Sequence, residues 1–361
     1  MVFINQANLQ YLTQHKYQST GYSKLDNLLN YFWCWVVSLL PDWLAPNLIT
    51  ILGLICMAGS YLIMVPFDTT FLKPMPSYIL LFSAFLQFMY QTLDACDGKQ
   101  ARKINQSSPL GMLLDHGCDS LSSTILLLDI LQGLSLGITA ESITFYCLVL
   151  ICFYLATWEE YHTHYCRTQI GSWGVTESQM TSITVFTISA LFGNDFLKTP
   201  IIFGYSAINL LIYGNIIIAS ITSMYMIYCV FITTKEKLKA LLRLLPIIEM
   251  TVSLVLWKSH PLTPTYGPLI FMIHGVIFSA ICSRLIICSV SRMSFGWFDF
   301  CAVLELVLLI ENYYIQTLPI FTSLLVFSAI IIAIYSLFVI GVVYQIANYL
   351  GISVFKVKLK Q

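Results

Sequence analysis

The 361-residue chain is strongly apolar, because 58% of its residues are hydrophobic and only 10% carry a charged side chain. Soluble globular domains carry about 25% charged residues, so the composition excludes an ordinary soluble domain and indicates a protein that crosses a membrane several times. The 18 basic and 18 acidic residues give no net charge, which argues against nucleic acid as a partner.

The N-terminal segment, about residues 1–45, precedes the first run long enough to cross a bilayer. It has neither the apolar core nor the small-residue cleavage site of a signal peptide. Its second half, SKLDNLLNYFWCWVVSLLPDWL, is rich in Trp, Phe and Leu but is interrupted by Lys24, Asp26 and Asn27. This pattern predicts an amphipathic helix that lies in the membrane interface instead of spanning the membrane.

Ten apolar runs follow, each close to the roughly 20 residues that a helix needs to cross a bilayer. They lie at about residues 48–67, 76–97, 109–136, 143–166, 178–194, 204–232, 240–258, 266–290, 299–316 and 319–348. No clear linker separates them. The predicted fold is therefore all-α: a polytopic membrane helix bundle of about ten transmembrane helices, with the N-terminal interfacial helix, in a single domain over residues 1–361.

Basic residues gather in four connecting segments: the N-terminus with Lys16 and Lys24, residues 99–103, residues 233–243, and the tail FKVKLK. Because basic loops remain on the cytosolic side of a membrane, these segments are expected to face the cytosol. Ten spans with both chain ends cytosolic is consistent with this assignment. The eleven cysteines are scattered singly and predict reduced thiols instead of a disulfide framework.

One polar stretch, DACDGKQARKINQSSPLGMLLDHGCDS at residues 94–120, interrupts this apolar chain. Asp94 and Asp97 are three residues apart on a helix that continues the second run, so their carboxylates share a face. Ser108 followed by Pro109 is typical of a helix start. The sequence therefore predicts two helices joined by a short loop.

The second of these helices carries Gly111, Asp115 and Asp119 in one stripe at intervals of four residues. Helices joined by a short loop pack as neighbours, so this acidic pair is expected to face Asp94 and Asp97. Four carboxylates at membrane depth require counterions. An ion-pair cluster with the basic residues at 99–103 is the structural alternative.

Oxygen ligands alone favour a hard cation such as Mg²⁺, Mn²⁺ or Ca²⁺ over zinc. Four aspartates neutralise two divalent ions, and a two-metal site suits an in-line displacement at phosphorus. Arg102 offers a forked positive charge for phosphate. Gly98 and Gly111 leave room either for a bulky anion or for close helix packing. The stretch thus predicts a site for a metal-bridged diphosphate.

The spacing Asp94-x₂-Asp97-Gly98-x₂-Ala101-Arg102-x₈-Gly111-x₃-Asp115-x₃-Asp119 resembles the signature of the CDP-alcohol phosphotransferase family. The segments LAPNLIT, YQTLD, DHGCDS and WEEYHTHY are similar to the choline and ethanolamine phosphotransferase branch. The resemblance implies transfer of phosphoethanolamine or phosphocholine from CDP-ethanolamine or CDP-choline to the hydroxyl of 1,2-diacylglycerol, which yields a phospholipid and CMP.

The resemblance also implies roles for individual residues. The four motif aspartates would hold two Mg²⁺ or Mn²⁺ ions, and Arg102 would contact the nucleotide phosphates. Asn47 and Tyr90 would contribute to the CDP-alcohol pocket, although the ordinary role of Asn47 beside Pro46 would be to cap a helix. Family precedent further favours a homodimer in the endoplasmic reticulum or Golgi membrane, with an active site that faces the cytosol.

The acceptor hydroxyl must lose a proton, and two residues compete for the role of base. His116 lies next to Asp115, and an imidazole suits proton transfer near neutral pH. Asp119 is the alternative, but a carboxylate bound to a metal is a weak base. Family precedent in the choline and ethanolamine branch also favours His116.

Three further questions stay open from sequence alone. An intramembrane prenyltransferase also binds a Mg-bound prenyl diphosphate through Asp-x-x-Asp clusters, and a cation transporter also buries acidic residues. The head group, choline or ethanolamine, is not specified by any residue pattern. In the segment WEEYHTHY, Glu159, Glu160 and His162 either line the substrate cavity or pair with an arginine.

Overall fold

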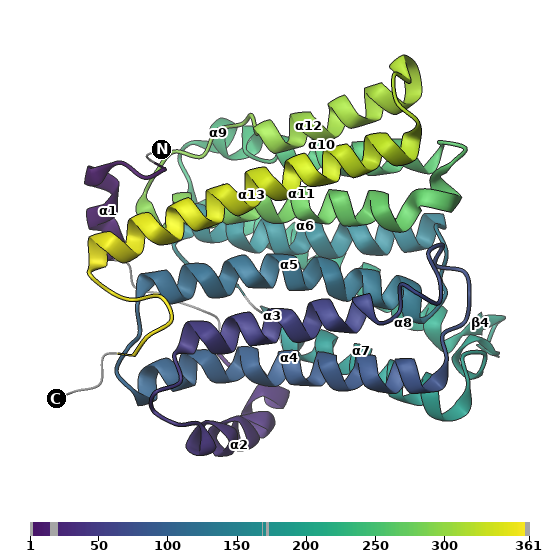
Figure 1. The fold of residues 1–361 in the computed structure, drawn as a ribbon, viewed down its shortest axis with the longest axis horizontal. Helices are drawn as coiled ribbons and strands as arrows, with labels where there is room; N and C mark the ends of the chain where they lie inside the picture. The colour runs from purple at the N-terminus through teal and green to yellow at the C-terminus, as the bar shows by residue number, and fades with distance from the viewer. Residues whose placement is uncertain (1–2, 15–20, 168, 171–172, 358–361) are drawn as a thin grey trace.

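The computed structural model describes residues 3–14, 21–167, 169–170 and 173–357. Long helices lie side by side along the molecule, and α1, α2 and the last described residues gather at one end (Figure 1). The helices are α1 (Gln6–Leu12), α2 (Lys24–Leu39), α3 (Pro46–Leu62), α4 (Ser77–Lys103), α5 (Pro109–Gly133), α6 (Ala140–Thr163), α7 (Val175–Phe192), α8 (Ala207–Thr233), α9 (Lys237–Leu242), α10 (Leu245–Lys258), α11 (Thr263–Ser291), α12 (Phe300–Ile310) and α13 (Ile320–Leu350).

Short irregular elements connect these helices. A 3₁₀ turn covers Phe196–Lys198, and a π-helical turn at Glu311–Ile315 extends α12. Two short antiparallel strand pairs, β1 (Gln169–Ile170) with β2 (Trp173–Gly174) and β3 (Pro200–Ile202) with β4 (Tyr205–Ser206), are also present. These strands were not expected from the sequence.

The predicted all-α membrane bundle is confirmed. Each of the ten expected runs coincides with a helical stretch of the described chain, with α9 and α10 together forming one of them. Within the described residues, six stretches are long and apolar enough to cross a membrane: α4, α6, α8, α9 with α10, α11 and α13. α3 is an apolar helix of 17 residues.

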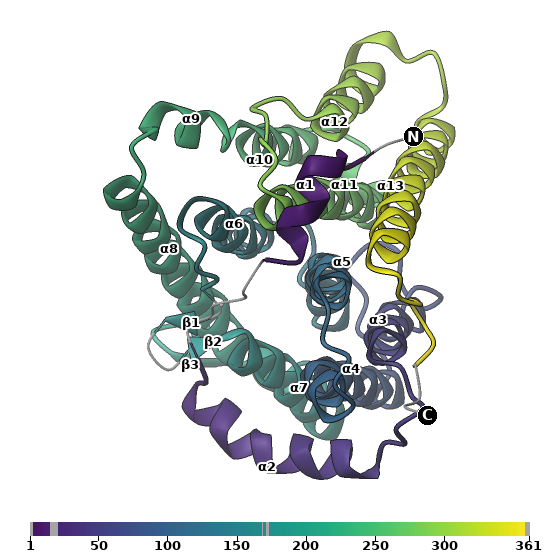
Figure 2. The same ribbon diagram turned by 90° about the vertical axis from the view of Figure 1, so that its left-hand side faces the viewer.

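Helix α5 is outside these six, and its position explains its polarity. It carries three aspartates and a histidine, yet it lies in the middle of the bundle, packed against α3, α4, α6, α11 and α13 (Figure 2). Polar side chains on such a helix face protein or a cavity instead of lipid, which removes most of their cost.

The first expected span ends earlier than predicted, at Leu62 instead of residue 67. The chain then forms an irregular loop around Asp68, which is buried. The two oxygens of Asp68 accept hydrogen bonds from Thr70 and from the backbone N–H groups of Leu72 and Lys73. These local bonds satisfy backbone groups without a helix, which a hydropathy pattern does not reveal.

Helix α2 runs crosswise along the rim of the bundle beside α4 and α7, whereas α3, α4, α5 and α11 are seen nearly end-on in the same view (Figure 2). A capping box between Ser23 and Asp26 fixes its start. Trp33 and Val37 are buried on the side that faces α4, while Trp35 and Leu39 are exposed. This two-sided helix agrees with the predicted interfacial element.

The loop between α4 and α5 is short because both helices have defined ends. The Ser108 hydroxyl accepts a hydrogen bond from the N–H of Gly111 at 3.1 Å, and Pro109 occupies the first turn of α5. At the end of α4, Asn105 adopts a left-handed conformation with φ 56°. As predicted, the motif therefore lies on two neighbouring helices at one end of the bundle.

Candidate active site

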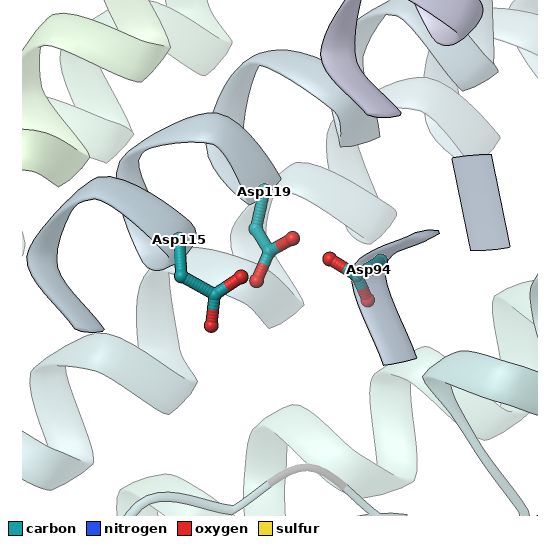
Figure 3. Close-up of side chains that lie close together, drawn as sticks. All are labelled: Asp94, Asp115 and Asp119. Atoms are coloured by element: carbon teal, nitrogen blue, oxygen red, sulfur yellow. The ribbon is translucent and has the colours of Figure 1, made fainter. Parts of the chain in front are cut away.

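Three motif carboxylates converge between α4 and α5. One oxygen each of Asp94, Asp115 and Asp119 lies within 4.8 Å of the others, and the three side chains point toward one another (Figure 3). All three are half-buried. The helical spacing places Asp115 and Asp119 on one stripe of α5 and Asp94 on the facing side of α4, so the sequence pattern accounts for this convergence.

Asp97, the fourth motif aspartate, has different surroundings. It is not one of the three convergent carboxylates, and its oxygens accept hydrogen bonds from the Thr50 hydroxyl on α3 and from the N–H of Gly98. Its side chain lines a cavity together with Asp115. The structure thus separates the four expected metal ligands into a group of three and a neighbouring carboxylate.

Two cavities, each of about 410 Å³, meet at this site. The first lies between α3, α4 and the start of α5, and we name it the nucleotide-side cavity after the role expected of Arg102 from the sequence. Its lining includes Asn47, Thr50, Asp97, Gly98, Arg102, Ser108, Gly111, Asp115 and His116. It combines carboxylates, hydroxyls and a guanidinium, which are groups that bind metal ions and phosphates.

The second cavity, the bundle cavity, lies between α5, α6, α7 and α8. Its lining includes Tyr90, Asp119, Glu160, Leu127, Ile130, Phe145, Val185 and Phe186. Asp115 and His116 are the residues that line both cavities. A reacting group that lies beside these two residues is therefore accessible from a polar side and from a largely apolar side.

Among the expected binding residues, Asn47, Gly98, Arg102 and Gly111 all line the nucleotide-side cavity. A Cβ atom on Gly98 would lie 3.5 Å from Nη1 of Arg102, and one on Gly111 would lie 3.3 Å from Oδ1 of Asn47. The contact at Gly111 is tight and joins α5 to α3, so this glycine permits close helix packing beside the cavity. At Gly98 the added Cβ would meet only the side chain of Arg102 on the same helix.

The surroundings of Asn47 and Tyr90 differ from those expected from the sequence. Asn47 does not cap α3, because Ala45 precedes the helix and the Nδ2 group of Asn47 donates to the backbone oxygen of Val354 at 2.8 Å. Tyr90 lines the bundle cavity instead, and its hydroxyl lies 3.1 Å from Oδ1 of Asp119. Tyr90 is therefore placed to orient an acidic side chain.

The two lysines of the motif interact with other parts of the chain than its aspartates. Lys103 forms an ion pair with Asp42 at 3.1 Å and donates to the backbone oxygens of Val37 and Leu40 at the end of α2. Lys99 lies over the ring of Trp33 at 5.0 Å. Both lysines thus attach α2 to α4, which argues against the ion-pair cluster as the reason for the acidic residues.

Several site residues were missed by sequence reasoning. Thr50, which binds Asp97, belongs to the quoted segment LAPNLIT but gives no signal of its own. Arg167 forms two hydrogen bonds with Glu159, at 2.8 and 3.0 Å, which settles Glu159 as an arginine partner. Arg167 and the buried Glu160 both line the bundle cavity.

The chemistry of the donor set fits a divalent metal ion. Oxygen ligands from three aspartates at mutual distances below 4.8 Å match the preference of Mg²⁺ and Mn²⁺. Among the ion pairs of the described residues, none joins an arginine or lysine to these carboxylates. Asp97 lines the nucleotide-side cavity together with Asp115.

Comparison with known proteins finds similarity over most of the chain. Residues 43–235 match the family model described as CDP-alcohol phosphatidyltransferase. The chain is 40% identical to cholinephosphotransferase 1 of Gallus gallus over 191 residues, or 53% of this chain and 56% of the relative. It is 35% identical to uncharacterized CDP-alcohol phosphatidyltransferase class-I family protein 2 of Dictyostelium discoideum over 297 residues, or 79% and 69%.

A third relative, the class-I family protein 1 of Dictyostelium discoideum, is 28% identical over 371 aligned positions that cover 100% of this chain and 97% of the relative. By contrast, the matched region spans about half the length of the cholinephosphotransferases. The region matched by the family model, residues 43–235, contains every lining residue of the two cavities except Ile286.

Proposed function

Because the chain belongs to the CDP-alcohol phosphatidyltransferase family, we propose that it transfers phosphoethanolamine or phosphocholine from CDP-ethanolamine or CDP-choline to the free hydroxyl of 1,2-diacylglycerol. The products are phosphatidylethanolamine or phosphatidylcholine and CMP. Similarity to cholinephosphotransferases supports choline as one head group. The transfer is the last step in making a phospholipid from a CDP-activated alcohol.

The observation that supports this proposal best is the meeting of the two cavities at Asp115 and His116. The reaction joins a highly charged, water-soluble donor to an apolar acceptor from the membrane. The nucleotide-side cavity, with its carboxylates and Arg102, suits the first substrate. The bundle cavity, with its aliphatic and aromatic lining, suits the second.

We assign the metal ligands to Asp94, Asp97, Asp115 and Asp119, which would hold two Mg²⁺ or Mn²⁺ ions. Bound divalent ions would neutralise the diphosphate and stabilise charge on the attacking and leaving oxygens. Arg102 would then bind the phosphates of the nucleotide through its guanidinium. Asn47, Gly98 and Gly111 would shape the nucleotide pocket, and Tyr90 would hold Asp119 in orientation.

The chemical step requires one proton transfer. The acceptor hydroxyl forms a bond to the phosphorus that carries the alcohol, and the bond from that phosphorus to the oxygen of CMP breaks. We assign the hydroxyl proton to His116, because this side chain lines both cavities and an imidazole accepts a proton near neutral pH. Asp119 is the alternative acceptor.

For the cellular setting we propose a multi-pass protein of the endoplasmic reticulum or Golgi membrane, with the active site facing the cytosol. The basic segment at residues 99–103 lies next to the site, and basic segments remain cytosolic. CDP-activated alcohols are water-soluble, so a cytosolic opening would give them access. We also propose a homodimer, from family precedent.

The test is release of CMP by the purified full chain in detergent with diacylglycerol and Mg²⁺. CDP-ethanolamine and CDP-choline are compared as donors, and Asp115→Asn serves as the inactive control. Release that requires the donor, the metal and diacylglycerol supports the proposal, and the ratio of the two rates identifies the head group. No release with either donor from folded protein contradicts it, and a prenyl diphosphate would then be assayed as the substrate.

A further inference from the structure

The bundle cavity has a defined direction. Its lining at one end is polar and includes Asp115, His116, Asp119, Glu160 and Arg167. Farther along, the lining becomes apolar: Leu127, Ile130, Leu134, Phe145, Val149, Val185, Phe186, Ile208 and Ile212. An amphiphile inside this cavity would place its polar end at the motif and its hydrocarbon chain toward the far end.

The order of the lining residues on the four surrounding helices is consistent with this direction. Along α5 the lining runs from Asp115 to Ile130, with Leu134 just beyond the helix, and α7 runs the same way from Val175 to Phe186. Helices α6 and α8 run oppositely, so that Phe145 and Ile208 near their starts line the far end. The cavity is thus elongated parallel to the helices.

The length of the cavity matches one acyl chain. From Val175 to Phe186 there are eleven helical steps, or about 16 Å at 1.5 Å per residue. The hydrocarbon core of a bilayer is about 30 Å thick, so the acyl chains of one leaflet reach about 15 Å. A chain whose glycerol lies at the motif would therefore extend to Phe186.

Phe186 lies at the far end of the cavity and is tightly packed there. Its side chain is fully buried, and a Cβ atom on Gly133 of α5 would lie only 2.4 Å from its Cζ atom. The ring therefore presses directly on the backbone of α5. Leu134 and Ile208, which also line the far end, are buried as well, so a longer chain would have to displace a ring that already presses on α5.

We propose that Phe186, backed by Gly133, sets the acyl-chain length of the diacylglycerol that the bundle cavity accepts. This inference rests on the proposed function and adds a specificity-determining residue to it. Each methylene group that the cavity buries contributes roughly fourfold to binding. Methylene groups beyond Phe186 contribute nothing and meet a clash, so the preference falls for longer chains.

The experiment is a competition. The full-length protein receives an equimolar mixture of diacylglycerols, each with two identical chains of 8 to about 24 carbons, and mass spectrometry gives the ratios of the products. These ratios do not depend on the amount of active enzyme. Phe186→Ala is expected to raise the share of products longer than the wild-type optimum by about fourfold or more. Ile130→Phe, which fills the far end from α5, is expected to move the optimum to shorter chains.

The matched control is Phe192→Ala. Phe192 lies on the same helix but is 65% exposed and does not line the cavity, so its product ratios should equal those of the wild type. Unchanged ratios in both cavity variants would overturn the proposal. If Phe186→Ala does not fold, the product ratios of Ile130→Phe alone test the proposal. Absence of product with every diacylglycerol in the wild type would instead refute the proposed function, so the two failures are distinguishable.

Discussion

His116 is the residue on which the proposed chemistry depends most. It lines both cavities next to Asp115. We predict that His116→Ala lowers turnover by about 10²–10⁴-fold, the usual loss when a general base is removed, while donor binding is kept. Turnover is measured as CMP release, and binding as the shift in melting temperature caused by CDP-choline.

Asp115→Asn provides the contrast, because loss of a metal ligand should weaken donor binding as well as turnover. Near-normal turnover of His116→Ala would remove histidine from the role of base and leave Asp119 as the candidate.

Thr50 is predicted to act on metal binding through Asp97. Its hydroxyl donates to the carboxylate of Asp97, and loss of such an outer partner typically costs 10–100-fold in metal affinity. Thr50→Val should therefore raise the Mg²⁺ concentration for half-maximal CMP release by about tenfold or more. Thr50→Ser keeps the hydroxyl and should behave like the wild type. If both variants need the same Mg²⁺ concentration for half-maximal CMP release, the Thr50 hydroxyl does not support metal binding by Asp97.

At the scale of residues, spacing along the helices was sufficient to predict that Asp94, Asp115 and Asp119 converge. It was not sufficient to separate Asp97 from them, because that difference depends on a hydroxyl from α3, 47 positions away in the chain. Likewise, the hydrogen bond between Asn47 and Val354 joins residues 307 positions apart. Contacts of this range follow from packing, which a local pattern does not contain.

Close packing of α11 on α5 depends on Gly275. A Cβ atom there would lie 1.8 Å from Cγ2 of Thr124 on α5, so Gly275→Ala forces the two helices apart. Overpacking of this kind costs about 1–3 kcal/mol, and we predict a lower melting temperature together with reduced activity, because α5 carries two motif aspartates. Gly214→Ala on α8 is the control, since no atom lies within 4 Å of its added Cβ. A normal melting temperature for Gly275→Ala would mean that the helices adjust without cost.

The loop between α3 and α4 should contribute stability that depends on pH. Burial raises the pKa of Asp68, but hydrogen bonds from Thr70 and from the backbone of Leu72 and Lys73 outweigh it and leave the pKa below its ordinary value. A lowered folded pKa stabilises the fold above the unfolded value of about 3.9, and this stability is lost as the pH falls through the folded pKa.

Asp68→Asn should therefore lower the melting temperature near pH 7, and the difference from the wild type should shrink near pH 3. Thermal unfolding in detergent at both pH values measures this, with the exposed Asp195→Asn as control. A difference that stays constant between the two pH values would contradict the assigned role of the charge.

At the scale of elements, apolar runs and helix-start signals predicted the positions of ten helical stretches and of α2. They did not predict the end of α3, since the bonds to Asp68 favour a loop within an apolar sequence. Nor did they predict the break between α9 and α10, where Pro246 in the first turn of α10 interrupts an otherwise continuous run.

For the whole molecule, we propose that residues 1–361 form one domain. Helices α11 and α13 lie outside the region matched by the family model, yet both pack on α5. The C-terminal part of the sequence showed only that it was apolar and helical, so its packing around the motif helix was not predictable from any motif.

The positions of the two chain termini in the bundle predict how the chain is oriented in the membrane. α1, α2 and the last described residues lie at one end of the bundle, and the connection between α12 and α13 lies at the other (Figure 1). In sealed microsomes, tags on both termini should be accessible to protease. A spaced glycosylation sequence inserted at residues 316–318 should acquire a glycan. Glycosylation of a tag at either terminus would contradict a cytosolic active site.

The hydrogen bond from Asn47 to Val354 has a consequence for biosynthesis. Asn47 is made early and enters the membrane with the first span, but its partner is added more than 300 residues later. Asn47 lines the nucleotide-side cavity, and it lacks this partner until residue 354 has been added. A ribosome-bound chain would therefore hold all four motif aspartates well before Asn47 is fixed by this bond, so the cavity would take its final form only after Val354 has emerged.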